Sequence, residues 1–76
     1  MSDERLVDAR GHRCPVPTLK LRRAVESAPS GQKIRVLADD PMARIDVPHF
    51  AAHAGLTILD SKTEDSIFSI LLQCPR

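Results

Sequence analysis

The chain has 76 residues, a hydrophobic content of 42% and a formal net charge of +1. This length fits one domain spanning residues 1–76, and the near-neutral charge argues against a dedicated nucleic-acid binder, which normally carries a large excess of Lys and Arg. The start of the chain is charged and no apolar run approaches the roughly 18 residues of a membrane span, so we expect a cytoplasmic protein with no membrane span.

The first half of the chain predicts a strand, a helix and a second strand. A short strand is expected over residues 5–9, and Gly11 ends it. Apolar residues then follow helical spacing over residues 15–28. Pro15 suits the first position of this helix, because its missing N–H costs nothing there. Residues 33–38 alternate clearly between the two faces of a predicted strand.

A second helix is predicted in the middle of the chain. Asp40 is expected to cap its start with a side-chain hydrogen bond. Pro48 interrupts the helical spacing, so we predict a short turn followed by a helix over about residues 47–54, which Gly55 ends.

The rest of the chain predicts a hairpin of strands over residues 56–62 and 67–74, joined by a polar connection at 63–66. The order β-α-β-α-β-β gives an α/β two-layer sandwich, a mixed four-stranded sheet with two helices on one face, since right-handed crossover makes the first two strands parallel. On the open face we expect apolar side chains: Leu37, Ile67 and Leu71. Because scattered apolar residues are normal on surfaces, we expect a monomer in isolation, with association through this face as the alternative.

The sequence "GHRCPVP" contains the residue that we predict to be reactive, Cys14. A cysteine reacts as its thiolate, and its pKa falls at a helix N-terminus or beside cations. Cys14 meets both conditions if Pro15 begins the helix. We predict that neighbouring residues support Cys14 by supplying positive charge, by stiffening the first turn of the helix or by letting the loop approach the helix closely. These residues are Gly11, His12, Arg13, Pro15 and Pro17. His12 is expected either to form an ion pair with the thiolate or to be a surface residue of the loop.

A second pattern lies on the predicted outward side of the first helix. Apolar and basic residues share that side: Val16, Leu19, Lys20, Arg22 and Arg23. Cations beside a reactive thiol would steer an acidic protein toward it, so we predict a partner-docking surface. A solvated helix face with two stray hydrophobic residues is the alternative.

Two acidic residues are predicted at the same sheet edge as Cys14. In an open α/β sheet, functional groups gather outside the carboxyl ends of parallel strands. The loop before Cys14 follows the first strand, and Asp39 and Asp40 follow the second. Asp39 is expected to pair with Arg13, to orient the cysteine loop, or to be an ordinary surface residue.

The motifs "DARGHRCPVP", "VLADDP" and "DVPHF" resemble those of the TusA/SirA/YeeD family of small sulfur-carrier proteins. The resemblance covers about residues 6–72 and implies a βαβαββ fold like that of the initiation factor C-terminal domain. It also implies that Cys14 accepts sulfane sulfur as a persulfide from a donor, such as a cysteine desulfurase or a rhodanese-like protein, and passes it to an acceptor protein. Such a transfer demands no metal and no organic cofactor.

The resemblance leaves the pathway open. Members of the family serve tRNA 2-thiouridine formation, sulfur oxidation or cofactor assembly. The ending "SIFSILLQCPR" lacks the basic aromatic end of some members in the tRNA pathway.

Three alternatives compete with sulfur carriage. If Cys74 formed a disulfide with Cys14 as its resolving cysteine, the chain would be a thiol-redox or regulatory protein. Strand alternation places Cys74 on the core face, however, where a buried thiol is expected. His49 and His53 have a metal-compatible spacing of four, but they lie opposite the apolar stripe of their helix, so we predict no metal site. Direct binding of nucleic acid is not expected, because the chain has no Tyr or Trp for base stacking.

Overall fold

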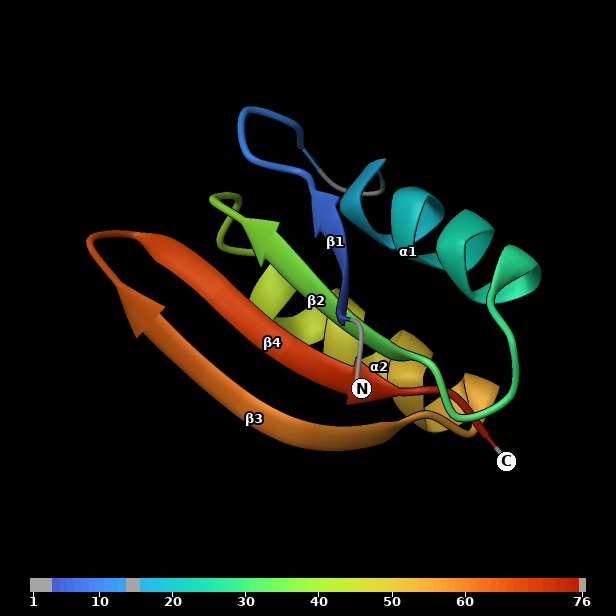
Figure 1. Cartoon of the computed structure of the whole chain (residues 1–76). Helices are drawn as coiled ribbons and strands as arrows, with labels where there is room; N and C mark the ends of the chain where they lie inside the picture. The colour runs from blue at the N-terminus through green and yellow to red at the C-terminus, as the bar shows by residue number, and fades with distance from the viewer. Residues whose placement is uncertain (1–3, 14–15, 76) are drawn as a thin grey trace.

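The computed structural model describes residues 4–13 and 16–75 of the chain. Its elements follow the predicted order βαβαββ (Figure 1). They are β1 (Glu4–Asp8), α1 (Val16–Ser27), β2 (Lys33–Ala38), α2 (Ala43–Ala54), β3 (Thr57–Glu64) and β4 (Ile67–Gln73). Neither helix within these described residues is long and apolar enough to cross a membrane.

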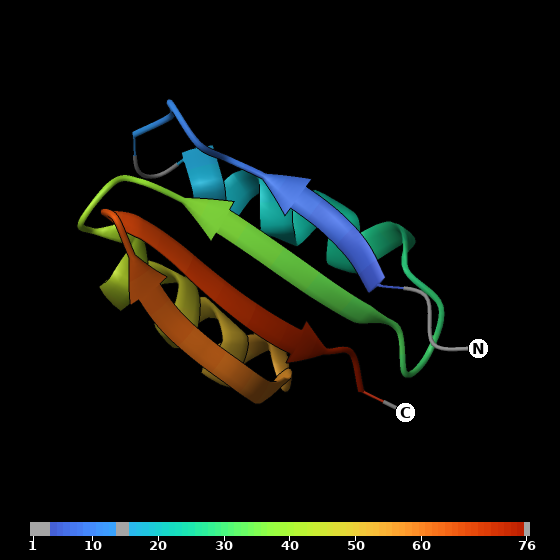
Figure 2. The ribbon, with the colours of Figure 1, turned by 60° about the vertical axis from the view of Figure 1, so that its left-hand side comes forward.

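The strands form one mixed sheet in the order β1-β2-β4-β3. β1 pairs in parallel with β2, and β4 runs antiparallel between β2 and β3. Both helices cover the same face of the sheet, and its other face is open (Figures 1 and 2). The predicted two-layer α/β sandwich is therefore confirmed, and the strand order places β1 and β3 at the two edges.

The core lies between the helices and the covered face of the sheet. Fully buried apolar side chains come from both helices and from the two central strands: Leu21, Ile34, Val36, Val47, Ile70 and Leu72. Burial of each such side chain contributes roughly 1.5–3 kcal/mol. Cys74 is buried at the end of this core, as its place in the strand alternation predicts.

The second helix is longer than the sequence predicts. We expected a turn and then a helix over about residues 47–54, but α2 is continuous from Ala43 and contains Pro48. Proline removes the hydrogen bond to the carbonyl four residues earlier, which here belongs to Arg44. Arg44 is exposed and is the second residue of α2, so the affected carbonyl lies in the first turn. The predicted interruption was wrong because the lost bond falls at the start of the helix.

The two ends of α2 are closed differently. Its N-cap is Met42, which makes no capping hydrogen bond with its side chain. The Oδ1 atom of Asp40 accepts a hydrogen bond from the Met42 N–H at 3.1 Å, so Asp40 closes the preceding turn and the prediction that it caps the helix was wrong. At the other end Gly55 has a left-handed φ of 75°, and the Leu56 N–H donates to the Ala51 carbonyl at 2.8 Å.

The hairpin turn is tighter than predicted. We expected the connection to span residues 63–66, but only Asp65 and Ser66 separate β3 from β4. Both have positive φ, at 50° and 67°, as in a two-residue type I′ turn, whose twist matches that of the strands. Most other boundaries differ from the predicted ones by one or two residues.

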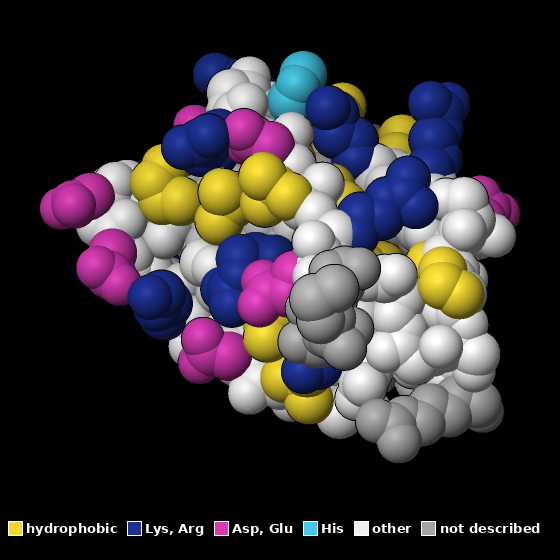
Figure 3. All heavy atoms as spheres, in the orientation of Figure 1, with side chains coloured by type: hydrophobic (Ala, Val, Ile, Leu, Met, Phe, Trp, Pro, Cys, Tyr) yellow, Lys and Arg dark blue, Asp and Glu magenta, His cyan; other side chains and the backbone are white. Residues whose placement is uncertain are grey.

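The open face of the sheet is partly polar. The three apolar residues expected there are half-buried: Leu37, Ile67 and Leu71. Arg35 crosses between strands on this face, because its guanidinium donates to Glu4 Oε1 at 3.0 Å and to Ser69 Oγ at 2.8 Å. Hydrophobic and charged side chains are therefore interspersed over the sheet (Figure 3).

Candidate functional site

The loops that follow β1 and β2 meet at one edge of the sheet. The two strands are parallel neighbours, so their carboxyl ends lie side by side. A pocket of about 420 Å³ lies between the loops. Residues of both loops line it: Gly11, His12, Arg13, Asp39, Asp40 and Pro41. All except Pro41 were predicted from the sequence to lie beside Cys14.

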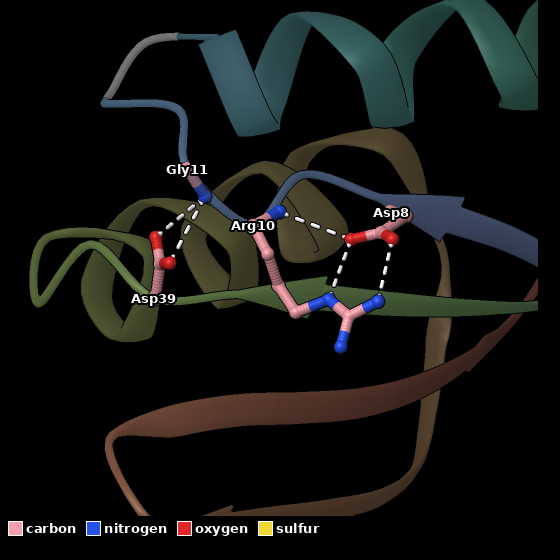
Figure 4. A network of polar contacts seen from close by, with 4 residues as sticks. All are labelled: Asp8, Arg10, Gly11 and Asp39. Atoms are coloured by element: carbon pink, nitrogen blue, oxygen red, sulfur yellow. Dashed lines mark hydrogen bonds and ion pairs between the residues drawn. The ribbon is translucent and has the colours of Figure 1, made fainter.

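Asp39 holds the loop that precedes Cys14. The Gly11 N–H donates to both carboxylate oxygens of Asp39, at 3.0 and 2.9 Å (Figure 4). Gly11 has a φ of 82°, and an added Cβ would meet nothing within 4 Å. Glycine is therefore favoured here by backbone conformation rather than by lack of space. Of the roles considered for Asp39, this contact supports orientation of the loop.

A bidentate ion pair between Asp8 and Arg10 stiffens the start of the same loop. The Nε and Nη2 atoms of Arg10 donate to the two oxygens of Asp8 at 2.9 and 2.8 Å, and the Arg10 N–H donates to Asp8 Oδ1 at 3.1 Å (Figure 4). These hydrogen bonds lower the pKa of Asp8 to about 2, and a weaker attraction from Lys20 acts in the same direction. Asp8 in turn raises the pKa of Arg10.

Arg10 was not among the residues singled out in the sequence. The sequence pattern that could have indicated its role is an Asp two residues before an Arg at the end of a predicted strand. An Asp in that position often accepts a hydrogen bond from the backbone N–H two residues later.

Cys14 and Pro15, the residues central to the predicted chemistry, lie outside the described residues. Both flanking segments are described, and the Val16 N–H donates to the Arg13 carbonyl at 2.9 Å. α1 has no acidic residue in its first turn, so no carboxylate there offsets the positive end of the helix dipole. His12 and Arg13 are exposed just before it. The start of α1 therefore favours a negative charge.

The predicted docking residues on α1 fall into different environments. Leu19 is 48% exposed and Val16 is half-buried, whereas Pro17, for which a supporting role was predicted, is fully buried and anchors the start of the helix in the core. The basic residues are exposed: Lys20, Arg22 and Arg23. Lys20 and Arg23 line a groove against β1, which Arg22 does not reach.

Cys74 lies at the opposite end of the sheet from Gly11. It follows β4, whose last residue pairs with the first residue of β2. The Cys74 N–H donates to the Gln32 carbonyl at 2.8 Å, and burial raises the pKa of the Cys74 thiol. This thiol therefore stays protonated at neutral pH.

His49 and His53 lie on α2, away from the pocket between the loops. Both are exposed, and their ring centroids are 4.5 Å apart in an edge-to-face arrangement. No group of three or more metal-binding side chains gathers within residues 4–13 and 16–75.

Comparisons with known proteins place these features in a wider group. Residues 5–74 match the family model described as Sulfurtransferase TusA, which includes both loops of the pocket and all of α1. A solved structure of a SirA-like protein from Desulfitobacterium hafniense is similar, with a TM-score of 0.81 and 22% sequence identity. The match covers 93% of this chain and 97% of that one, and establishes that the two share a fold.

Proposed function

Since this chain belongs to the TusA sulfurtransferase family, we propose that it carries sulfur as a persulfide on Cys14. The proposed donor is a protein such as a cysteine desulfurase or a rhodanese-like protein. The proposed recipient is an acceptor protein in tRNA 2-thiouridine formation or in sulfur oxidation. The observation that carries the proposal is the place of Cys14 in the sequence, within the matched residues and directly after the pocket-lining Arg13.

The proposed transfer is an exchange between sulfur atoms. The Cys14 thiolate attacks the outer sulfur of the donor persulfide, an S–S bond forms at Cys14, and the S–S bond of the donor breaks. The donor cysteine leaves as a thiolate, so the step needs no outside oxidant or reductant. In the second step an acceptor thiolate attacks the outer sulfur, and Cys14 leaves as a thiolate. A thiol that is ionised at neutral pH serves both steps.

The charges around the loop support this chemistry. His12 and Arg13 line the pocket, and the start of α1 carries no acidic residue. Asp39 is engaged with the Gly11 N–H, and Asp8 with Arg10. The carboxylates of Asp39 and Asp8 are thus both held by hydrogen-bond donors of the loop itself.

The position of Cys74 supports a carrier over a redox pair. Its thiol is buried at the end of the sheet opposite Gly11, and a disulfide requires Cα atoms within about 7 Å of each other. We therefore assign Cys74 a structural role in the core.

Sulfur loading tests the proposal. The protein is incubated with a cysteine desulfurase and cysteine, and its intact mass is measured. Wild type and Cys74→Ser should each gain the mass of one sulfur atom, which a reductant removes, and Cys14→Ser should gain none. Circular dichroism checks that both variants are folded. Loss of the gain in Cys74→Ser, with the gain retained in Cys14→Ser, would contradict the assignment.

A further inference from the structure

A groove of about 380 Å³ runs between the outer edge of β1 and helix α1. Its walls include Arg5, Leu6 and Asp8 from the strand, and Lys20, Arg23 and Ser27 from the helix. β1 runs alongside α1 and leads into the loop that contains Gly11 (Figure 1). Asp8, the last residue of β1, lines the groove, so the groove points toward the loop that precedes Cys14.

The edge of β1 that faces this groove has no strand partner among the described residues, because β1 pairs with β2 alone. The Ala9 N–H, just beyond β1, donates to the Leu37 carbonyl at 2.8 Å. In a parallel pair, each residue turns its N–H and C=O to one side, and the side alternates along the strand. Val7 therefore faces β2, and the backbone groups of Leu6 and Asp8 face outward.

The groove combines this free edge with positive charge. Lys20 and Arg23 are one helical turn apart on α1. Arg5 adds a third cation, which is held by a hydrogen bond from its Nη1 to Ser27 Oγ at 2.8 Å. The carboxylate of Asp8 is engaged by Arg10. Lys and Arg side chains gather on this part of the surface, over α1 and its border with β1 (Figure 3).

We propose that a partner protein docks by adding an extended acidic segment to the edge of β1, in the groove beside α1. In strand addition, main-chain hydrogen bonds provide affinity and side-chain contacts provide specificity. Leu6 and Asp8 supply the main-chain groups, and Lys20 and Arg23 bind the acidic side chains. The inference rests on the proposed function, because the segment would lead its protein to the loop before Cys14.

A proline substitution separates strand addition from simple charge attraction. The Leu6 side chain is 57% exposed, and its N–H faces away from β2. Proline is tolerated on an edge strand where the N–H faces solvent, so Leu6→Pro removes the donor while keeping the pairing with β2. Leu6→Ala is the matched control, because it shortens the side chain and keeps the N–H.

The probe is a synthetic peptide of alternating Glu and Val, about eight residues long. Its binding is followed by NMR titration of the labelled protein. Leu6→Pro should bind it about tenfold more weakly than Leu6→Ala, because a main-chain hydrogen bond is lost in the proline variant alone. Hydrogen exchange of the Leu6 and Asp8 amides in wild type should slow on saturation, a readout that needs no variant. A peptide of alternating Lys and Val should not bind.

Three results would overturn the inference: no binding of the Glu–Val peptide, equal affinity in the two Leu6 variants, or unchanged exchange of the Leu6 and Asp8 amides. Equally tight binding of a poly-uridylate oligonucleotide in the groove would assign it to nucleic acid instead. Loading of Cys14 from polysulfide, a small donor that needs no docking, is measured in parallel. If loading succeeds and strand addition fails, only the groove assignment is lost, whereas failure of loading in wild type rejects the proposed function.

Discussion

The two ends of the sheet are closed by different kinds of contact. Where β1 and β2 end, exposed carboxylates hold the loops through Asp39 to Gly11 and Asp8 to Arg10. At the other end, uncharged groups close the structure, as the Gly31 N–H and the Ser30 hydroxyl donate to the Pro75 carbonyl at 3.2 and 3.1 Å. The Cys74 thiol is buried there. Charged contacts at an exposed edge respond to substitution and pH at little cost to the core, whereas the closed end depends on packing.

One small chain thereby combines a stable core with an edge whose loops are exposed. Surface ion pairs and exposed hydrogen bonds contribute about 1 kcal/mol or less each, and the loss of a core side chain costs several times as much. The loops around the pocket can therefore change charge while the fold persists.

The largest effect is expected at the closed end. Leu72 is fully buried and pairs with Ile34 across the sheet. Leu72→Ala should lower the free energy of unfolding in urea by about 2–5 kcal/mol, because it leaves a cavity. Loading of Cys14 from polysulfide should be unchanged in the protein that remains folded. Leu71→Ala, at a half-buried position on the open face, is the control and should cost less. Equal losses in both variants would show that the covered face is not the main source of stability.

A smaller effect is expected from Asp39→Ala, which removes both acceptors of the Gly11 N–H. The free energy of unfolding should fall by about 1 kcal/mol, since the contact is exposed. Hydrogen exchange of the Gly11 amide should accelerate, and that of Gly31 at the opposite end should not. Asp39→Asn keeps one acceptor oxygen and should lie between. If Gly11 and Gly31 accelerate equally, the contact does not hold the loop locally.

The smallest effect is expected at low pH, from the loss of the ion pair between Arg10 and Asp8. Arg10→Gln should raise the pKa of Asp8 from about 2 toward its ordinary 3.8, because it removes the side-chain hydrogen bonds that hold the carboxylate. The folded-state pKa of Asp8 lies below its unfolded value, so its contribution to stability is present above about pH 4 and is lost as the pH falls toward 2. NMR titration of the Asp8 carboxyl carbon measures the shift. Arg22→Gln should leave that pKa in place, and a shift of equal size there would make the effect one of general charge.

The order of elements was predictable because each helix and strand buries one face, and burial leaves a periodic trace in the sequence. β2 shows this most clearly, with Ile34, Val36 and Ala38 buried in alternation. The family resemblance was confirmed by the match over residues 5–74. Its motifs include the loop that Asp39 holds, so the sequence placed most of the pocket-lining residues in one neighbourhood.

Other features depended on contacts that periodicity does not report. The groove exists because β1 is an edge strand, and the strand order is set by pairing between distant segments. The bidentate ion pair between Asp8 and Arg10 requires a particular backbone turn, which a spacing of two residues does not specify. Pro48 was misjudged because the effect of a proline depends on its distance from the start of the helix.

The central place of β2 in the sheet affects how the chain folds during synthesis. β2 pairs with β1, which is translated before it, but also with β4, which is translated last of the elements. On the ribosome, β1, α1 and β2 emerge early, yet the sheet lacks its second central strand until β4 has left the exit tunnel. Pairing between segments so distant in sequence slows folding relative to local contacts. The elements on either side of Cys14 in the sequence, β1 and α1, therefore gain their complete support only after β4 has been translated.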